Sequence, residues 1–285
     1  MNPKITSELI KDLRERSGVG MSKCKDALVE ADGDIEKAAE ILRKKGLASA
    51  VKKEGRETKE GVIGFFESKN EIGLIEVNTE TDFVAKSEKF QKFVNELAEQ
   101  VAKNTPTSLE GFLKENYNID PSLTIDEYRN LLIQAIGENI QVSRILAIHK
   151  DKNSSYGIYS HMNGKIVTIV EIKGCDKEEK TARDIAMHVA AEDPQYLKEE
   201  NIPEAVKNKE EEIARSQIKD KPEFVIEKIV AGKIKAFADQ TCLLNQKYIK
   251  DPNISVQTFV QNRGKEIKKD LSLNCFWRWK IGESV

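Results

Sequence analysis

The segment that decides the fold is Ile75-Glu76-Val77-Asn78-Thr79-Glu80-Thr81-Asp82-Phe83-Val84-Ala85-Lys86-Ser87. Its first part is predicted to be a β-strand, because apolar residues stand at Leu74, Ile75 and Val77. A polar turn follows, and then a helix whose first free amides can be capped by the Ser87 hydroxyl. Asp82 and Phe83 are therefore neighbours on a short connection between two regular elements.

Two interpretations of this connection are open. In the first, Phe83 folds back into the core and Asp82 is a turn residue without further role. In the second, the two side chains form a probe that enters another molecule. Strand-to-helix connections often meet ligands or partners, because the flanking elements hold the loop while its side chains face outward.

Four segments, in this order along the chain, resemble the motifs of bacterial elongation factor Ts, the guanine-nucleotide exchange factor of elongation factor Tu. The resemblance covers nearly the whole chain, and we identify the chain as a member of that family. The matching residues are Leu-Arg-Glu-Arg-Ser-Gly-Val-Gly-Met-Ser-Lys-Cys-Lys-Asp-Ala-Leu (13–28), Glu-Val-Asn-Thr-Glu-Thr-Asp-Phe-Val-Ala (76–85), Ala-Met-His-Val-Ala-Ala (186–191), and Gly-Lys-Ile (232–234) with Cys-Leu-Leu-Asn-Gln (242–246) and Lys-Asp-Pro (250–252).

The length and charge of the chain limit the kinds of partner it can have. A chain of 285 residues suits two or three small domains. Charged residues make up 33% and aromatic residues 6%, which is typical of a soluble, helix-rich protein. Because 46 Lys and Arg face 48 Asp and Glu, no net basic field attracts nucleic acid or a membrane. We therefore expect partners to be recognised by shape and local contacts.

The cysteines and the apolar runs indicate a cytoplasmic protein. The four cysteines lie far apart and form no Cys-x-x-Cys pair, which disfavours a disulfide or zinc framework. No run of about 18 apolar residues occurs, and the N-terminus lacks the apolar core of a signal peptide. Homodimerisation is compatible with the sequence, but no feature of the sequence supports it.

The N-terminal region is predicted to be a bundle of three amphipathic helices (residues 1–46). Apolar residues recur at helical spacing, as in Cys24, Ala27, Leu28 and Ala31. Ser22 and Asp34 are expected N-caps, and Gly46 is expected to end the third helix. The resemblance implies a bundle of the ubiquitin-associated type. Residues 47–60 carry alternating charges and are predicted to be a solvated linker.

From Gly61 onward the pattern changes to strands. Residues 62–67 and 72–77 are predicted to form a hairpin, followed by a helix that ends at Thr105-Pro106. A second helix begins at Thr124, forms a capping box with Glu127 and stops at Gly137, before a strand over 140–148.

The same pattern then recurs. Residues 157–161 and 166–172 flank an Asn-Gly turn, and a helix with apolar Ala182, Ile185 and Val189 follows. We expect an α+β fold in which the core consists of two similar hairpin-plus-helix subdomains with antiparallel sheets, over 61–150 and 151–285. Residues 200–240, broken at Pro222, are predicted to be a projecting helical hairpin, and 256–281 a helix and a strand.

No set of catalytic, cofactor-binding or metal-binding residues is found in the sequence. The three histidines have no metal-binding spacing, and no Gly-x-Ser-x-Gly motif occurs. His188, inside an apolar stretch, is interpreted as a core or interface residue and not as a general base. We expect a protein without covalent chemistry.

The resemblance implies a set of partner-binding residues. Phe83 would wedge between two helices of elongation factor Tu and dislocate its Mg²⁺ site, Asp82 would contact the displaced segment, and Thr81 and Val84 would hold the loop. The implied further contacts are made by Arg14, Met21, Ile136, Gly137 and His161. For Met21, composition alone also allows a structural role in closing the lower end of the bundle.

The resemblance implies that the chain is a translation elongation factor which binds elongation factor Tu, both GDP-bound and nucleotide-free, and promotes exchange of GDP for GTP. The alternative from another class is an adaptor associated with the ribosome or with nascent chains, which would use the N-terminal bundle. An enzyme whose site is assembled across the subdomains is a third, weaker hypothesis.

Overall fold

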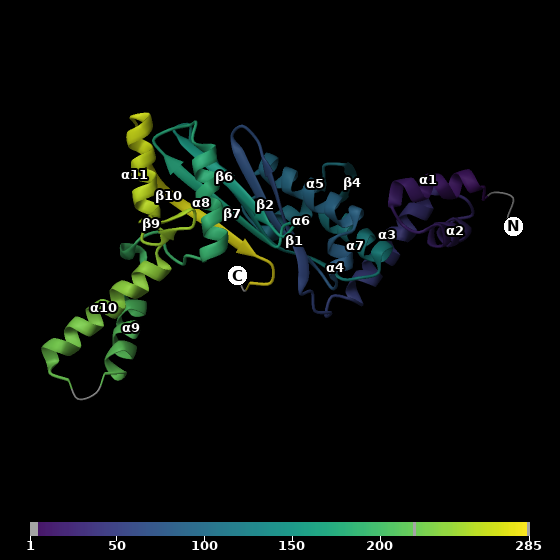
Figure 1. Cartoon of the computed structure of the whole chain (residues 1–285). Helices are drawn as coiled ribbons and strands as arrows, with labels where there is room; N and C mark the ends of the chain where they lie inside the picture. The colour runs from purple at the N-terminus through teal and green to yellow at the C-terminus, as the bar shows by residue number, and fades with distance from the viewer. Residues whose placement is uncertain (1–4, 219–220, 284–285) are drawn as a thin grey trace. The chain divides into compact units, whose positions relative to one another are not determined.

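The computed structural model describes residues 5–218 and 221–283 (Figure 1). Helices and antiparallel strands are mixed in this part of the chain, so the α+β class is confirmed. The described residues divide into two compact units. Unit 1 comprises 5–149, 163–165 and 280–283, and unit 2 comprises 150–162 and 166–279. The finer division predicted from the sequence, at 46, 60 and 150, stays a prediction.

Unit 1 begins with three helices, α1 (Ser7–Ser17), α2 (Met21–Glu30) and α3 (Ile35–Val51). Their apolar faces meet in a small core that includes the fully buried Leu13, Leu28 and Leu42. Asp34 caps α3 as predicted, because its carboxylate accepts hydrogen bonds from the amides of residues 36 and 37 at 3.1 Å.

Two helix boundaries predicted for this region are wrong. The N-cap of α2 is Gly20 and not Ser22, which lies inside the helix. Gly46 does not end α3, which continues to Val51. A Cβ at Gly46 would lie 3.3 Å from a side-chain carbon of Leu131. The missing side chain at Gly46 thus serves the close packing of α3 on α7 (Ile125–Ile136), not a turn.

The rest of unit 1 is an antiparallel sheet, in the order β1-β2-β5, with helices packed on it. The strands of this sheet are β1 (Glu60–Glu67), β2 (Glu71–Thr79) and β5 (Ile140–His149), while β3 (Asn116–Tyr117) and β4 (Asp120–Thr124) pair separately. The helices are α4 (Asp82–Ala85), α5 (Glu88–Asn104), α6 (Leu109–Lys114) and α7. The apolar face of α5 carries Phe90, Phe93 and Leu97 into the core beside Ile75 and Val77. The predicted capping box of Thr124 and Glu127 is present.

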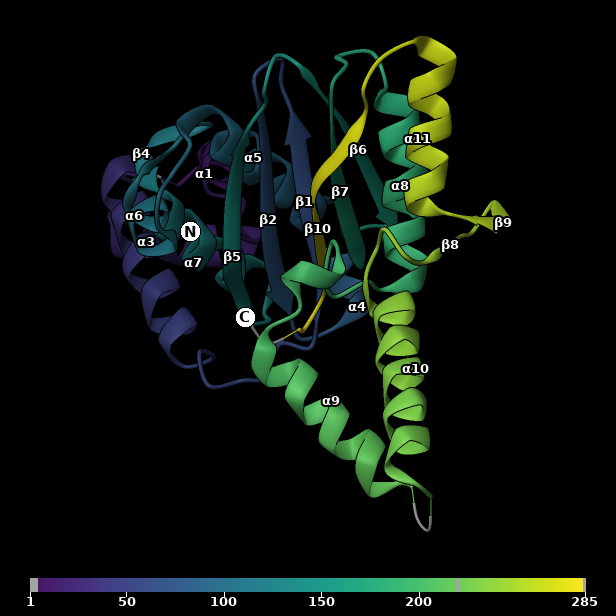
Figure 2. The same ribbon diagram turned by 90° about the vertical axis from the view of Figure 1, so that its left-hand side faces the viewer.

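Unit 2 contains a second antiparallel sheet, in the order β10-β7-β6. Its elements are β6 (Ser154–His161), β7 (Ile166–Lys173), α8 (Glu179–Glu192), the 3₁₀ helix η1 (Glu199–Asn201), α9 (Glu204–Ser216), α10 (Glu223–Thr241), β8 (Lys247–Tyr248), β9 (Asp251–Ser255), α11 (Val256–Ile267) and β10 (Ser272–Lys280). Figure 2 shows α8 running along β6 and β7, against which it packs.

The hairpins of the two units share one local arrangement. Gly64 pairs with Ile75 across β1 and β2, and Gly157 pairs with Val170 across β6 and β7. A Cβ at either glycine would collide with the covering helix, at 2.5 Å from a side-chain carbon of Val94 for Gly64. In both units, therefore, a glycine lets a helix approach the first strand of the hairpin closely.

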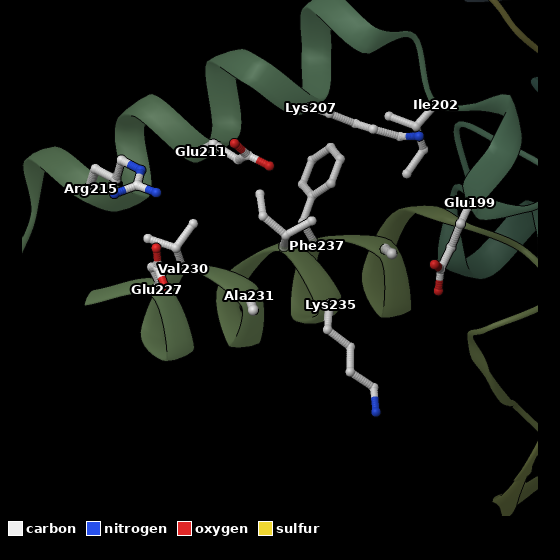
Figure 3. Close-up of a pocket in the computed structure, with 12 residues that line it drawn as sticks. Glu199, Ile202, Lys207, Glu211, Arg215, Glu227, Val230, Ala231, Lys235 and Phe237 are labelled. Carbon is white, nitrogen blue, oxygen red and sulfur yellow. The ribbon is translucent and has the colours of Figure 1, made fainter. Parts of the chain in front are cut away.

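Helices α9 and α10 extend away from the sheet of unit 2 in both views (Figures 1 and 2). The predicted break at Pro222 is observed, because this proline is the residue before α10. A pocket of about 760 Å³ lies between the two helices (Figure 3). Val230 and Phe237 line it on the α10 side, and Lys207 and Arg215 on the α9 side. Over 5–218 and 221–283, the structure has no helix of the length and hydropathy needed to cross a membrane.

Candidate partner-binding site

Residues 81–84, expected from the sequence to be a polar loop, belong to a single helical turn, α4 (Asp82–Ala85), and to its N-cap Thr81. Thr81 is the N-cap of α4, and its hydroxyl oxygen accepts a hydrogen bond from the Val84 amide at 3.4 Å. On this turn the Phe83 side chain is 82% exposed, whereas Ala85 is buried. The interpretation of Phe83 as a core anchor is therefore wrong, and the turn presents an aromatic ring to solvent.

Asp82 is ionised and remains accessible at the start of this turn. Its carboxylate accepts a hydrogen bond from Lys86 Nζ at 2.6 Å. That hydrogen bond is the main cause of a lowered Asp82 pKa, although partial burial acts in the opposite direction. The turn thus carries a negative charge directly beside the exposed ring.

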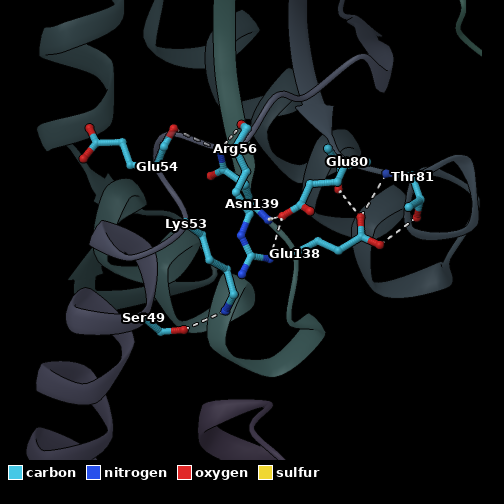
Figure 4. Close-up of polar contacts among 9 residues, drawn as sticks. Ser49, Lys53, Glu54, Arg56, Glu80, Thr81, Glu138 and Asn139 are labelled. Carbon is cyan, nitrogen blue, oxygen red and sulfur yellow. Dashed lines mark hydrogen bonds and ion pairs between the residues drawn. The ribbon is translucent and has the colours of Figure 1, made fainter.

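Glu138 ties the turn to a distant part of unit 1 (Figure 4). One carboxylate oxygen accepts a hydrogen bond from the Thr81 hydroxyl at 2.7 Å. The other accepts from the Thr81 amide at 3.0 Å and from the Thr79 hydroxyl at 3.1 Å. Hydrogen bonds to an ionised acceptor are about twice as strong as neutral ones. The residue before Asp82 and Phe83 is therefore held in both its backbone and its side chain.

Asn139 adds a second connection next to the first (Figure 4). Its amide donates to the Glu80 carboxylate at 2.6 Å, and its side-chain amide donates to the Arg56 carbonyl at 3.0 Å. Arg56 in turn lies 3.4 Å from the same Glu80 oxygen. Asn139 is 2% exposed, so its own two hydrogen bonds are largely shielded from water, whereas the Arg56 side chain remains half exposed. The segment before β1, the end of β2 and the segment after α7 are joined at this point.

The predicted residues Ile136 and Gly137 lie directly before these two. Gly137 ends α7 in the left-handed conformation, with φ of 97°, and its amide donates to the Ile133 carbonyl at 2.9 Å. Ile136 packs against the core of unit 1. The structure thus brings the Ile136-Gly137 bend together with the turn that carries Phe83.

Glu138 and Asn139 were not among the site residues predicted from the sequence. A usable signal was present, because these two polar residues stand between the helix stop at Gly137 and the apolar start of a strand at Ile140. What the sequence lacks is the pairing of β5 with β2, which places residues 138 and 139 beside 79–81.

Arg14 and Met21 lie in the N-terminal bundle and are both exposed. Met21, the first residue of α2, is 50% exposed, which does not fit a residue that closes the bundle. The neighbouring corner is tied to the rest of unit 1. Lys89 Nζ donates to the Gly18 carbonyl at 2.9 Å, and Lys23 Nζ donates to the Gln134 carbonyl at 2.7 Å. Met21 therefore lies between contacts to the first turn of α5 and the last turns of α7.

The three histidines differ in their surroundings. His161, the last residue of β6, is exposed in unit 2, and its Nδ1 lies 3.2 Å from the Tyr159 hydroxyl. His188 is fully buried, and both its ring nitrogens have hydrogen-bond partners. The interpretation of His188 as a satisfied core residue is confirmed. In the part of the chain that the structure describes, no group of three or more His, Cys, Asp or Glu side chains could hold a metal ion.

Phe83 is thus an exposed aromatic side chain on a held turn, and aromatic side chains are enriched among the residues that anchor protein–protein interfaces. The family model of elongation factor TS matches residues 80–283. The elongation factor Ts of Protochlamydia amoebophila (strain UWE25) is 53% identical over 279 residues, which cover 98% of this chain and 99% of that protein. Those of Chlamydia muridarum (strain MoPn / Nigg) and Chlamydia felis (strain Fe/C-56) are 46% and 44% identical over 275 residues, covering 96% of this chain and 98% of each relative.

These findings define a protein of the translation elongation class. More narrowly, the chain belongs to the elongation factor Ts family. The resemblance seen in the sequence is thereby confirmed.

Proposed function

We propose that the chain is a guanine-nucleotide exchange factor for elongation factor Tu. It binds the GDP-bound and the nucleotide-free partner and promotes replacement of GDP by GTP without covalent chemistry, in the cytoplasm. Membership of the elongation factor Ts family supports this function. The single observation in the structure that carries it is the exposure of Phe83 on a turn whose N-cap, Thr81, is held by two hydrogen bonds to Glu138.

In this proposal, Phe83 enters the partner between two helices below the Mg²⁺ site of its nucleotide pocket. Mg²⁺ demands near-ideal octahedral geometry, so a small shift of its surroundings weakens both metal and diphosphate. Burial of one phenylalanine ring contributes about 1.5–3 kcal/mol, which helps to drive such a shift. Asp82 contacts the displaced segment, while Thr81 and Val84 fix the angle of the turn.

The remaining site residues contact the partner around Phe83, which acts as the wedge. Arg14 and Met21 contact its nucleotide-binding domain from the N-terminal bundle, which we take to be of the ubiquitin-associated type. Ile136 and Gly137 brace the wedge from within unit 1, and His161 contributes from unit 2. Because coupling is reciprocal, the free energy by which the factor weakens nucleotide binding equals that by which nucleotide weakens binding of the factor.

Stopped-flow release of a fluorescent GDP from elongation factor Tu tests the proposal. The chain is expected to accelerate release, and Phe83→Ala to remove most of the acceleration. Ile119→Ala is the matched control, since Ile119 is another apolar side chain with high exposure, 62%, in the β3–β4 turn of the same unit. Equal release rates with the intact chain and with Phe83→Ala would contradict the wedge.

A further inference from the structure

The hydrogen bonds of Glu138 bear on how Phe83 is aimed. α4 has only four residues, and a helix of one turn does not hold its own shape in water. The direction of the Phe83 side chain is therefore set by whatever fixes the ends of that turn. At its start, the fixed residue is Thr81.

Thr81 is fixed by a single side chain from outside the turn. Glu138 accepts from both the amide and the hydroxyl of Thr81, and the same carboxylate also accepts from Thr79, a fully buried residue of β2. Two of these three hydrogen bonds come from Thr81 and the third anchors the carboxylate to β2, so Thr81 can rotate little. We call these hydrogen bonds of Glu138 to Thr79 and Thr81 the Glu138 clamp. Because Glu138 follows Gly137 directly, the clamp and the bend at the end of α7 belong to one short segment.

The strength of the Glu138 clamp matters when the Phe83 ring pushes against a partner. A ring that displaces helices of a partner meets an opposing force, which passes back through α4 into Thr81. The other contacts of α4 are apolar or local, as in the Lys86–Asp82 pair, except at its far end, where the Gln91 side-chain amide donates to the Ala85 carbonyl at 2.6 Å. Thr81 is thus the attachment of the turn on the N-terminal side of Phe83. The charged hydrogen bonds at Thr81 are directional.

We infer that Glu138 is a positioning residue for nucleotide exchange: it holds Thr81 so that Phe83 keeps its direction when it enters the partner. This inference rests on the proposed function and names a residue that acts through Thr81, not by contact with nucleotide. Glu138 also connects the Ile136-Gly137 bend rigidly to the Phe83 turn. A partner that contacts the bend therefore also fixes the position of the turn.

The test separates the maximum rate of GDP release from the concentration of factor that gives half of that rate. For Glu138→Ala the maximum rate is expected to fall about tenfold or more, because misplacement by ~1 Å can cost about 10²-fold when geometry is strict. The half-saturating concentration should change less than the rate. Glu138→Gln keeps one carbonyl oxygen for Thr79 and the Thr81 amide, and it should restore most of the rate.

A double-mutant cycle with Phe83→Ala distinguishes positioning from a separate contact. If Glu138 acts through the ring, Glu138→Ala in the Phe83→Ala background should cause almost no further loss. Thr81→Val, which removes the hydroxyl but keeps the amide, should give an intermediate rate and keeps the inference testable if Glu138→Ala folds poorly. Glu110→Ala is the control, because Glu110 is an exposed acid of α6 in the same unit.

Two results would overturn the inference: a normal maximum rate for both Glu138→Ala and Thr81→Val, or additive losses in the cycle with Phe83→Ala. Thermal unfolding of each variant shows whether a lower release rate only reflects a lower folded fraction. In that case the release rates of the Glu138 variants would follow their thermal stabilities. Failure of the proposed function gives a different pattern, since the unmodified chain itself would not accelerate release.

Discussion

His188 Nε2 lies 3.0 Å from the side-chain oxygen of Gln246, 58 residues further along the chain. The Ile249 amide donates to the other ring nitrogen, Nδ1, at 3.3 Å. Nδ1 is thus an acceptor, so the proton of the neutral imidazole is on Nε2. The side-chain nitrogen of Gln246 donates to two carbonyls, of residues 192 and 240, which leaves its oxygen to accept from His188. Two motifs of the sequence therefore meet as a core contact in unit 2.

This contact predicts a pH-dependent stability. Burial lowers the pKa of His188 below its ordinary value of about 6.5, although Gln246 and Glu192 act in the opposite direction. Below pH 6.5, His188 takes up a proton in the unfolded chain but stays neutral in the folded chain until the pH falls to its lowered pKa. The free energy of unfolding should therefore fall as pH drops below 6.5, by at most about 1.4 kcal/mol per pH unit from this group.

Urea unfolding of the intact chain and of His188→Gln between pH 7.5 and 5.5 checks this expectation. The variant has lost the titrating group, so its free energy of unfolding should depend less on pH in this window, whatever its stability at pH 7.5. Parallel pH profiles for the two proteins would show that His188 does not contribute.

Truncation of Phe93 should destabilise the fold strongly, whereas truncation of Phe83 should not. Phe83 is 82% exposed and Phe93 is 1% exposed in the core beneath β1 and β2. Phe93→Ala is expected to cost about 3–5 kcal/mol of stability, because it removes buried contacts and leaves a cavity. Phe83→Ala should leave the unfolding midpoint nearly unchanged, as measured by chemical denaturation. A large stability loss for Phe83→Ala would mean that the ring is buried in solution.

A buried ion pair in unit 1 should be costly to break from one side. The Arg144 guanidinium donates to the Glu76 carboxylate at 2.7 Å, and the Glu76 side chain is 3% exposed. Arg144→Met removes the cationic partner of this charge and leaves the Asn78 side chain and the Gly282 amide as its donors, at an expected cost of about 3–5 kcal/mol. The double variant Glu76→Met with Arg144→Met should recover most of the loss. Arg16→Met is the control, since Arg16 pairs with Asp12 and Glu36 in solvent and should matter little.

The sequence predicted those elements whose signals are local. The capping box at Thr124, the cap at Asp34 and the stop at Gly137 all act within one helical turn, and each is observed. The error at Gly46 arose because a distant contact overrides the local signal, whereas the N-cap of α2 was misplaced by two residues, from Gly20 to Ser22. Gly46 looks like a helix stop, but it packs against α7.

The candidate site shows the same limit. The resemblance pointed to residues 81–84 and to Ile136 and Gly137 separately. The hydrogen bonds that connect them join Thr81 to Glu138, which is 57 residues further along the chain. Such a connection depends on the register of β2 with β5, which hydrophobic periodicity does not specify at the level of single hydrogen bonds. Exposure of Phe83 was likewise undecidable from the sequence, since a phenylalanine in a turn suits either a core or an interface.

Two glycines of unit 2 should respond to alanine with opposite signs. A Cβ at Gly157 would lie 2.0 Å from the backbone nitrogen of Arg183, so α8 would have to move off β6, at an expected cost of about 1–3 kcal/mol. Gly232 lies in the middle of α10, and a Cβ added there would have no other atom within 4 Å. Its replacement by alanine should therefore stabilise that helix by about 0.5–1 kcal/mol. Denaturant midpoints of Gly157→Ala and Gly232→Ala measure both effects. Equal shifts in the same direction would show that helix propensity, and not the approach of α8 to β6, governs the response at Gly157.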